Sequence, residues 1–183
     1  METQLNKFSS SGFDKRANIL KITLWYFINA LLVRASWNPF MKPKILLLKL
    51  FGAQIGEGLV MKNNVNIKYP WKIKIGDNVW IGENVWIDNL DDVVIENDVC
   101  ISQGALLLTG NHDYSLSTFD YRNAPIILEK GVWVGAKSIV CPGVTAHSHS
   151  VLTVGSVTSK DLEEYSIYQG NPAKVIRKRI IKR

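Results

Sequence analysis

The sequence has few cysteines and no apolar run of membrane-spanning length. Cys100 and Cys141 are too few for a disulfide framework and too far apart for a pair of metal ligands, which fits a reducing cytosol. The apolar run at 19–33 contains Lys21 and Asn29 and lacks a following small-residue cleavage site, so it is not typical of a signal peptide. It is also shorter than the roughly 20 residues of a membrane span. We therefore expect a cytoplasmic protein.

Acidic residues are outnumbered by basic ones. The 183 residues suit a single domain, and 22 Lys and Arg against 16 Asp and Glu give a net charge of +6, which favours an anionic partner such as a phosphate or a membrane surface. Six of the last ten residues are basic. Because this charge is terminal and does not follow an aromatic-bearing face, we expect no nucleic-acid partner.

Residues 1–54 are expected to form a helical extension. One helix can be capped by Asp14, and apolar residues cover most of its surface, so something must cover it. We favour packing against the rest of the chain; the alternative is a peripheral, in-plane contact of residues 14–34 with the inner face of a membrane. A second helix, at about 44–51, should end at Gly52. The basic residues that would assist a membrane contact are Lys15, Arg16, Lys21 and Arg34.

Residues 55–160 repeat in sixes, as in IGEGLV, IGDNVW and IGENVW. The first position is aliphatic, the fifth is small or branched, and turn-forming residues lie between them. Because side chains alternate along a strand, Val79 and Ile81 should face inward and Trp80 outward. Stacked units of this kind predict a parallel β-helix, an all-β fold.

The spacing of the units predicts a triangular coil. Units begin at 55, 61 and 67 and again at 75, 81 and 87, so two extra residues follow every third unit. One corner should therefore carry a small bulge in each turn. Trp80, Trp86 and Trp133 all occupy the outward sixth position, which suggests burial against another copy of the chain or a ligand.

The stretch 109–125 interrupts the repeat and contains His112, the only histidine before position 147. A long irregular loop inside a regular scaffold is typical of a functional site. Such a loop should leave the coil between two stacked turns.

Several longer motifs resemble those of the hexapeptide-repeat acyltransferases, and most closely polysaccharide O-acetyltransferases of the colanic acid type. They are LLLKLFGAQIG (46–56), IKYPWKIKIG (67–76), ISQGALLLTGNHDY (101–114), APIILEKGVWVGA (124–136) and GNPAKVIRKR (170–179). The resemblance implies a left-handed coil with a short C-terminal helix in the basic tail 161–183. It also implies a homotrimer with its sites between subunits, acetyl-CoA as co-substrate and no metal.

By its place in GNHDY, His112 resembles the catalytic histidine of this family. A neutral imidazole suits removal of a hydroxyl proton near pH 7 and its return to the departing thiolate. The sequence leaves open whether Asp113 or a backbone carbonyl orients this ring. The residues expected at the acceptor, a sugar or a lipid-linked oligosaccharide, are Asn89, Asp88, Asp113 and Tyr114.

The resemblance places the coenzyme along small residues at the coil edge, where backbone groups can approach the pantetheine arm. Gly135, Ala136, Gly155 and Ser156 would bind the arm, and Trp133 would form the wall of the channel. Further contacts are expected from Ser159 and Lys160 near the adenosine, and from Lys174 and Arg177 near the phosphates.

The function implied is transfer of acetyl to a sugar hydroxyl of an exopolysaccharide or surface polysaccharide precursor. Alternatives are a small acceptor, such as a free sugar or an antibiotic, and a non-catalytic assembly prism. A zinc enzyme on the same scaffold would need three converging histidines, a spacing that His112, His147 and His149 do not offer. The last two are instead expected as turn residues.

Overall fold

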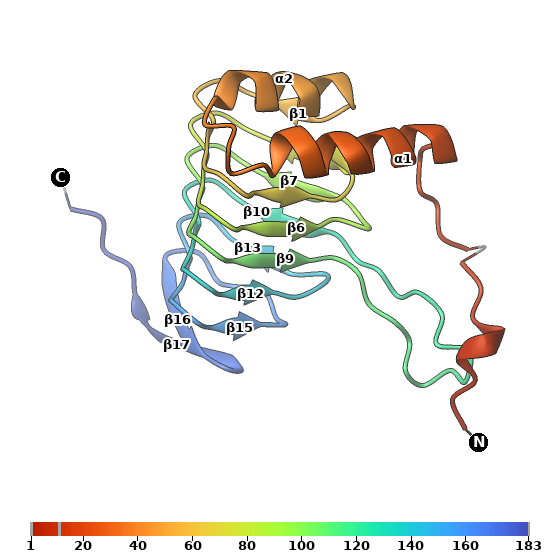
Figure 1. Cartoon of the computed structure of the whole chain (residues 1–183). Coiled ribbons are helices and arrows are strands. Elements are labelled where there is room, and N and C mark those ends of the chain that lie inside the picture. The colour runs from red at the N-terminus through yellow and green to blue at the C-terminus, as the bar shows by residue number, and fades with distance from the viewer. Residues whose placement is uncertain (1, 11, 183) are drawn as a thin grey trace.

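A computed structural model describes residues 2–10 and 12–182 and shows a coil of three parallel sheets with two helices stacked on one end (Figure 1). Sheet A contains β1 (Gln54–Ile55), β4 (Ile73–Ile75), β7 (Val93–Ile95), β10 (Ile126–Leu128) and β13 (Thr145–Ala146). Sheet B contains β2 (Val60–Met61), β5 (Trp80–Ile81), β8 (Cys100–Ile101), β11 (Trp133–Val134), β14 (Val151–Leu152), β16 (Ser166–Gly170) and β17 (Ala173–Lys178). Sheet C contains β3 (Asn66–Ile67), β6 (Trp86–Asp88), β9 (Leu106–Leu108), β12 (Ile139–Val140) and β15 (Val157–Thr158).

The strand register confirms the triangular coil. Each turn adds one strand to sheets A, B and C in that order, so the three sheets meet at three corners. Lys74 pairs with Val94, and Ile127 with Thr145, so a turn spans 20 residues before the loop and 18 after it. The two extra residues fall at the corner between sheets C and A, where the 3-10 helix η3 (Pro70–Lys72) lies. The left-handed sense of the coil stays a prediction.

The core is one narrow column of inward side chains. Val79 and Ile81 are at most 1% exposed, whereas Trp80 between them is 61% exposed, as the repeat predicted. Corner residues such as Asn78 and Asn84 adopt positive φ, a conformation that asparagine tolerates well. Six-residue units thus form strands of two or three residues, joined by sharp corners that contain a residue with positive φ.

Two helices cover one end of the coil: α1 (Ile19–Ile28), with its π-helical continuation η2 (Asn29–Val33), and α2 (Met41–Leu50). The short 3-10 helix η1 (Leu5–Lys7) lies apart from them, near the N-terminus (Figure 1). The predicted Asp14 cap is wrong: the side chain of Asn18 accepts the Lys21 N–H at the start of α1. The second helix is confirmed, with Gly52 at φ 107° after it. In the described part of the chain, no helix has both the length and the apolar character to cross a membrane.

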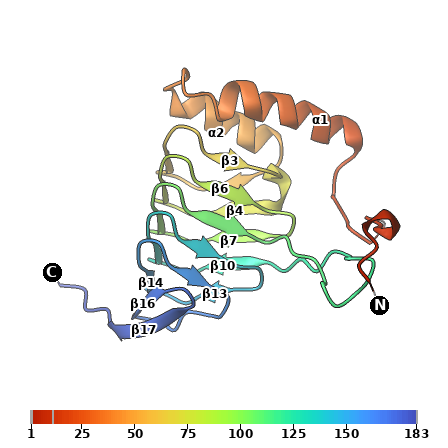
Figure 2. The same cartoon turned by 60° about the horizontal axis from the view of Figure 1, so that its bottom comes forward.

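The predicted C-terminal helix is also wrong. β16 pairs with β14 and extends sheet B by one more turn, and β17 folds back antiparallel to β16 (Figure 2). Without β16, the N–H and C=O groups at the edge of β14 would have no backbone partner. A strand supplies hydrogen-bond partners for these groups, whereas a helix would not. Val175 and Ile176 on β17 have high strand propensity, in keeping with this outcome.

Candidate active site

The irregular loop leaves the coil after β9, at the corner between sheets C and A that carries the extra residues. Its two limbs are joined by backbone hydrogen bonds, from the Asp113 N–H to the Asp120 carbonyl and from the Arg122 N–H to the Asn111 carbonyl, both 2.8 Å. Figures 1 and 2 show the loop projecting away from the prism beside the N-terminal segment. The chain therefore presents His112 on a braced hairpin outside its own coil.

His112 is oriented by a backbone carbonyl. Its Nδ1 lies 2.6 Å from the carbonyl oxygen of Phe119, and its ring stacks on the Phe119 ring at 4.4 Å and near the Tyr121 ring at 4.9 Å. Since a carbonyl can only accept, Nδ1 carries the proton and donates it. The lone pair is therefore on Nε2, the nitrogen that can act as a base.

The carbonyl that orients His112 belongs to a residue in an unusual backbone conformation. Phe119 has φ 57°, a region that bulky residues rarely adopt. The hydrogen bond from the Phe119 N–H to Leu116 and the stacking on His112 hold it there. Such local strain is concentrated at functional sites in proteins.

Asp113 does not orient the histidine. Its carboxylate accepts hydrogen bonds from the Ser115 hydroxyl and from the Ser115 N–H, and these two bonds hold the pKa of Asp113 below its ordinary value. Tyr114 is 82% exposed, on the outer side of the loop. The structure therefore selects the backbone carbonyl from the two possibilities that the sequence left open.

An N-terminal arm, residues 2–10 and 12–16, lies against the loop, a contact that the sequence analysis did not predict. The Phe8 ring meets the rings of His112 and Tyr121 edge-on at 5.7 and 5.2 Å, and Phe13 lies 5.0 Å from Tyr121. The Gln4 N–H also donates to the Ser117 carbonyl at 2.8 Å. Aromatic residues from both segments thus enclose one side of the imidazole.

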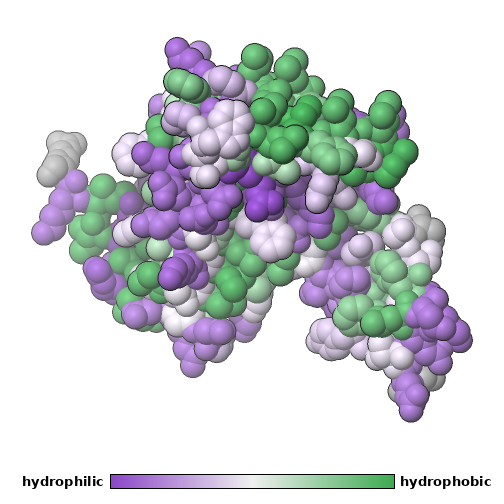
Figure 3. All heavy atoms as spheres, in the orientation of Figure 1, coloured by the Kyte–Doolittle hydropathy of each residue, from purple (hydrophilic) through white to green (hydrophobic). Residues whose placement is uncertain are grey.

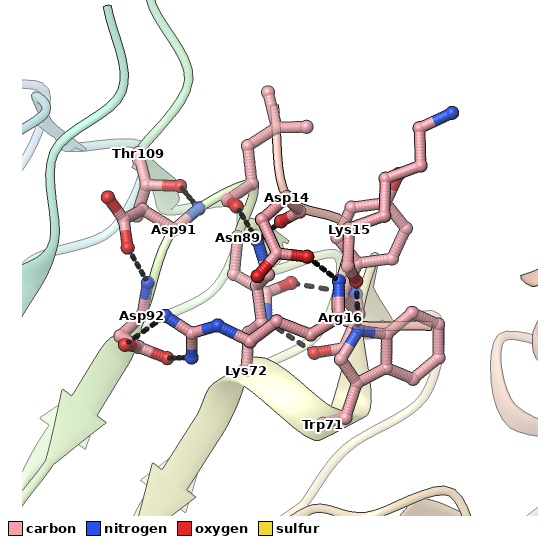
Figure 4. Close-up of polar contacts among 11 residues, drawn as sticks. Asp14, Lys15, Arg16, Trp71, Lys72, Asn89, Asp91, Asp92 and Thr109 are labelled. Carbon is pink, nitrogen blue, oxygen red and sulfur yellow. Dashed lines mark hydrogen bonds and ion pairs between the residues drawn. The ribbon is translucent and has the colours of Figure 1, made fainter. Parts of the chain in front are cut away.

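The arm is anchored to the coil by the KYPWK segment (Figure 4). Lys72 is 4% exposed and donates to the carbonyls of Asp14 and Leu90, both at 2.6 Å. Burial lowers the pKa of Lys72, with a smaller contribution from Arg16. Trp71 Nε1 donates to the Lys15 carbonyl at 2.7 Å, so consecutive residues of KYPWK hold consecutive residues of the arm.

A second anchor joins the arm to the next turn. Arg16 forms a two-pronged ion pair with Asp92, with N–O distances of 2.7 and 3.1 Å, and these contacts raise the pKa of Arg16. Next to it, a cavity of about 320 Å³ lies between arm, corner and loop. Its polar lining includes Asp14, Lys72, Asp91, Tyr121 and Arg122.

Asn89 has a structural position. It is fully buried, its amide nitrogen donates to the Tyr69 carbonyl at 2.6 Å, and its amide oxygen accepts the Tyr69 N–H at 2.9 Å. Both ends of the amide therefore join two turns of the coil, and the predicted contact of Asn89 with the acceptor stays a prediction. Asp88 is the last residue of β6, the strand that pairs with β9. It is 8% exposed, and its carboxylate lies 2.8 Å from the Lys68 ammonium.

Four of the predicted donor residues, Gly135, Ala136, Gly155 and Ser156, share one edge, the corner between sheets B and C. Gly135 follows β11, and the Gly155 N–H donates to the Ala136 carbonyl at 2.9 Å, so these two corners stack directly. A Cβ on Gly135 would lie 2.6 Å from the Val154 nitrogen, which explains the glycine by stacking. At Gly155 a Cβ would meet no atom within 4 Å, so this edge is open to a ligand.

The other predicted donor residues lie on neighbouring strands and corners of the coil. Trp133 is 46% exposed and its indole donates to the Ser102 hydroxyl. Ser156, on the shared edge, is buried, and its hydroxyl accepts the Gly170 N–H at 3.0 Å. Ser159 and Lys160 are exposed beyond β15, at the next corner. Lys174 and Arg177 are exposed on β17, which continues sheet B.

His112 and the donor edge occupy different corners of the coil. The loop leaves between sheets C and A, whereas Ala136 and Gly155 lie between sheets B and C, with sheet C separating them. The two remaining histidines belong to neither place. His149 is a corner residue with φ 60°, as predicted, and His147 contacts Glu129 at 3.0 Å. Among the described residues no three His, Cys, Asp or Glu side chains cluster as metal ligands would.

Comparison with known proteins places this scaffold in a family. The chain is 34% identical over 178 residues to the putative colanic acid biosynthesis acetyltransferase WcaF of Escherichia coli, covering 96% of this chain and 97% of that protein. This chain belongs to the hexapeptide-repeat acetyltransferases. No family model matches the sequence.

Solved structures share the fold of this acetyltransferase. A hexapeptide-repeat acetyltransferase of Vibrio cholerae in complex with acetyl coenzyme A superimposes with a TM-score of 0.80 at 18% identity, covering 93% of this chain and 92% of the other. A galactoside acetyltransferase in complex with coenzyme A gives 0.78 at 25% identity, covering 87% of this chain and 80% of the other.

Proposed function

We propose that this acetyltransferase transfers acetyl from acetyl coenzyme A to a sugar hydroxyl of an exopolysaccharide or surface polysaccharide precursor, with His112 as general base. The observation that carries the mechanism is the contact of 2.6 Å between His112 Nδ1 and the Phe119 carbonyl. The name of the Escherichia coli relative supports the polysaccharide acceptor, and the coenzyme complexes of the structural relatives support the donor.

In this mechanism Nε2 of His112 removes the proton of the acceptor hydroxyl as its oxygen attacks the thioester carbonyl carbon. The C–O bond forms, the carbonyl π electrons move to oxygen, and a tetrahedral intermediate results. When the intermediate collapses, the C–S bond breaks and the imidazolium returns its proton to the thiolate sulfur. One histidine thus serves both steps, and no covalent intermediate on the protein is needed.

We place the pantetheine arm along the edge formed by Ala136 and Gly155, beside Trp133. The open space at Gly155 and the exposed Trp133 indole support this placement. The cations Lys174 and Arg177 lie where sheet B continues past this edge, which suits the coenzyme phosphates. Ser159 and Lys160 remain candidates for the adenosine end.

We place the acceptor in the polar cavity of 320 Å³ between arm and loop. Carboxylates, a buried ammonium and a phenol in its lining can hydrogen-bond several hydroxyl groups, as a sugar requires. Tyr121 belongs both to this lining and to the stack around His112, so it connects the cavity with the base.

We propose a homotrimer whose sites lie between subunits. The separation of His112 from the donor edge within one chain supports this arrangement, because a neighbouring coil must then supply one half of each site. The three outward tryptophans, 61%, 47% and 46% exposed at positions 80, 86 and 133, are apolar surface that such contacts would cover.

The acceptor is identified by offering acetyl coenzyme A with nucleotide sugars, lipid-linked oligosaccharides, free sugars and antibiotics, and by following the mass of each. We expect a gain of one acetyl group on a saccharide precursor. Acetylation confined to free sugars or antibiotics would overturn the polysaccharide assignment, and transfer to none of them would favour a non-catalytic prism.

A further inference from the structure

The two helices at the end of the coil carry an outward apolar face, which we call the roof face. On α1 and η2 it consists of side chains spaced i, i+4, i+7 and i+11, which is one stripe of a helix. Its exposed residues are Leu20 (73%), Leu24 (51%), Phe27 (55%) and Leu31 (62%) from this stripe, with Leu46 (58%) and Leu50 (71%) from α2. Figure 3 shows the apolar surface gathered over this end of the molecule.

A different stripe attaches these helices to the coil. Trp25, Asn29 and Val33 are buried on the opposite side of α1 and η2, and Trp25 Nε1 donates to the Ile67 carbonyl at 3.0 Å. On α2 the attachment uses Leu48, which is fully buried. The fold therefore already has its packing surface, and the roof face is additional apolar area.

The charge around the roof face has one sign. Residues 15–56 contain seven Lys and Arg and no Asp or Glu. Three of these cations contact groups inside the protein: Arg16 pairs with Asp92, Lys44 donates to Asn63, and the Lys21 ammonium lies 4.7 Å from the centre of the Trp71 ring. The other four are Lys15, Arg34, Lys42 and Lys49.

We propose that the roof face binds a lipid bilayer containing anionic headgroups. Leucine and phenylalanine side chains would enter the boundary between headgroups and acyl chains, and the surrounding cations would contact the lipid phosphates. A protein partner would need acidic residues to contact these cations. The helices that carry the roof face have no acidic residues, so the roof faces of two copies of this chain would repel each other.

This inference deepens the proposed function and rests on it in one respect. In a trimer with parallel coils, three roof faces lie at the same end and meet one membrane together, which multiplies weak contacts. The acceptor would then be a saccharide carried on a lipid, presented at the surface where the enzyme is bound.

The test is sedimentation of the full chain with vesicles of phosphatidylcholine and phosphatidylglycerol, and with vesicles of phosphatidylcholine alone, without acceptor or coenzyme. We expect binding to the anionic vesicles that weakens as salt rises. The double variant Leu24→Glu/Phe27→Glu should lose at least about 10-fold in binding, because it places charge in the apolar boundary. Both positions are exposed, so thermal unfolding should change little.

The matched control is Ile180→Glu/Ile181→Glu, which alters two neighbouring apolar residues, 80% and 56% exposed, in the C-terminal tail. It should bind vesicles like the unaltered protein. The proposal is overturned if the unaltered protein ignores anionic vesicles, if only the tail variant loses binding, or if the roof variant instead splits a larger assembly. Since no catalysis is measured, these results stand apart from the outcome of the acetylation assay.

Discussion

At the scale of single residues, the orientation of His112 depends on groups that carry no chemistry of their own. The carbonyl of Phe119 fixes the proton on Nδ1, and three aromatic rings, Phe8, Phe119 and Tyr121, limit the movement of the imidazole. Under the proposed mechanism, a base held in this way is already placed for proton transfer before the acceptor arrives. We therefore propose Phe8 as a positioning residue from a distant part of the sequence.

Replacing Phe8 by alanine removes one ring from the His112 stack while leaving the coil intact. We expect kcat to fall about 10-fold, since small errors in the placement of a base reduce the rate steeply, with little change in the KM for acetyl coenzyme A. Steady-state kinetics measure this split. Leu5→Ala is the control, because Leu5 is 62% exposed in the same arm and should leave kcat unchanged.

At the scale of elements, the N-terminal arm, the KYPWK corner and the loop form one assembly. Lys72 and Trp71 fix the arm, and the arm supports the loop that carries His112. The corner that holds two extra residues in the turns before the loop is therefore the place where the regular coil is connected to the loop that carries His112.

Replacing Lys72 by methionine keeps the length of the side chain and removes its two hydrogen bonds, a part-buried one to the Asp14 carbonyl and a buried one to the Leu90 carbonyl. We expect the free energy of unfolding to fall by about 1–3 kcal/mol and the arm to become sensitive to protease. Urea denaturation and limited proteolysis measure the two effects. Lys74→Met, at an exposed position on the adjoining strand, should show neither; equal losses in both variants would contradict the anchor.

The sequence predicted the coil well because its six-residue period records which side chains face inward. It predicted the two-residue bulge and the outward Trp80 from the same period, and the end of the second helix from Gly52. It could not show the arm, because Phe8 and His112 meet only through the three-dimensional course of the chain. The C-terminal helix came from the family resemblance and was wrong, because the open edge of sheet B determines the pairing of residues 166–178, an edge that becomes visible only in the folded coil.

At the scale of the whole molecule, one chain carries His112 and the predicted donor edge on different corners of the coil. The proposed trimer joins the loop of one subunit to the Ala136–Gly155 edge of another. Sites shared in this way can be restored by mixing two inactive chains with different lesions.

We therefore expect complementation between a His112→Ala chain and an Ala136→Trp chain, which blocks the donor edge. Random assembly of equal amounts should recover about a quarter of the sites, because each site draws one part from each of two subunits. The measurement is the acetyltransferase activity of the refolded mixture, compared with the activity of each variant refolded alone. Failure of the mixture to exceed its parents would place the whole site within one chain.

The most direct test of the proposed mechanism is the turnover of the His112→Ala variant with acetyl coenzyme A and the acceptor that the acetylation assay identifies by its gain in mass. We predict a loss of about 1,000-fold in kcat, with coenzyme affinity by calorimetry and assembly size unchanged, because only the base is removed. His147→Ala, which alters a histidine outside the loop, should keep full activity. If His112→Ala turns over as fast as the unaltered enzyme, His112 is not the base.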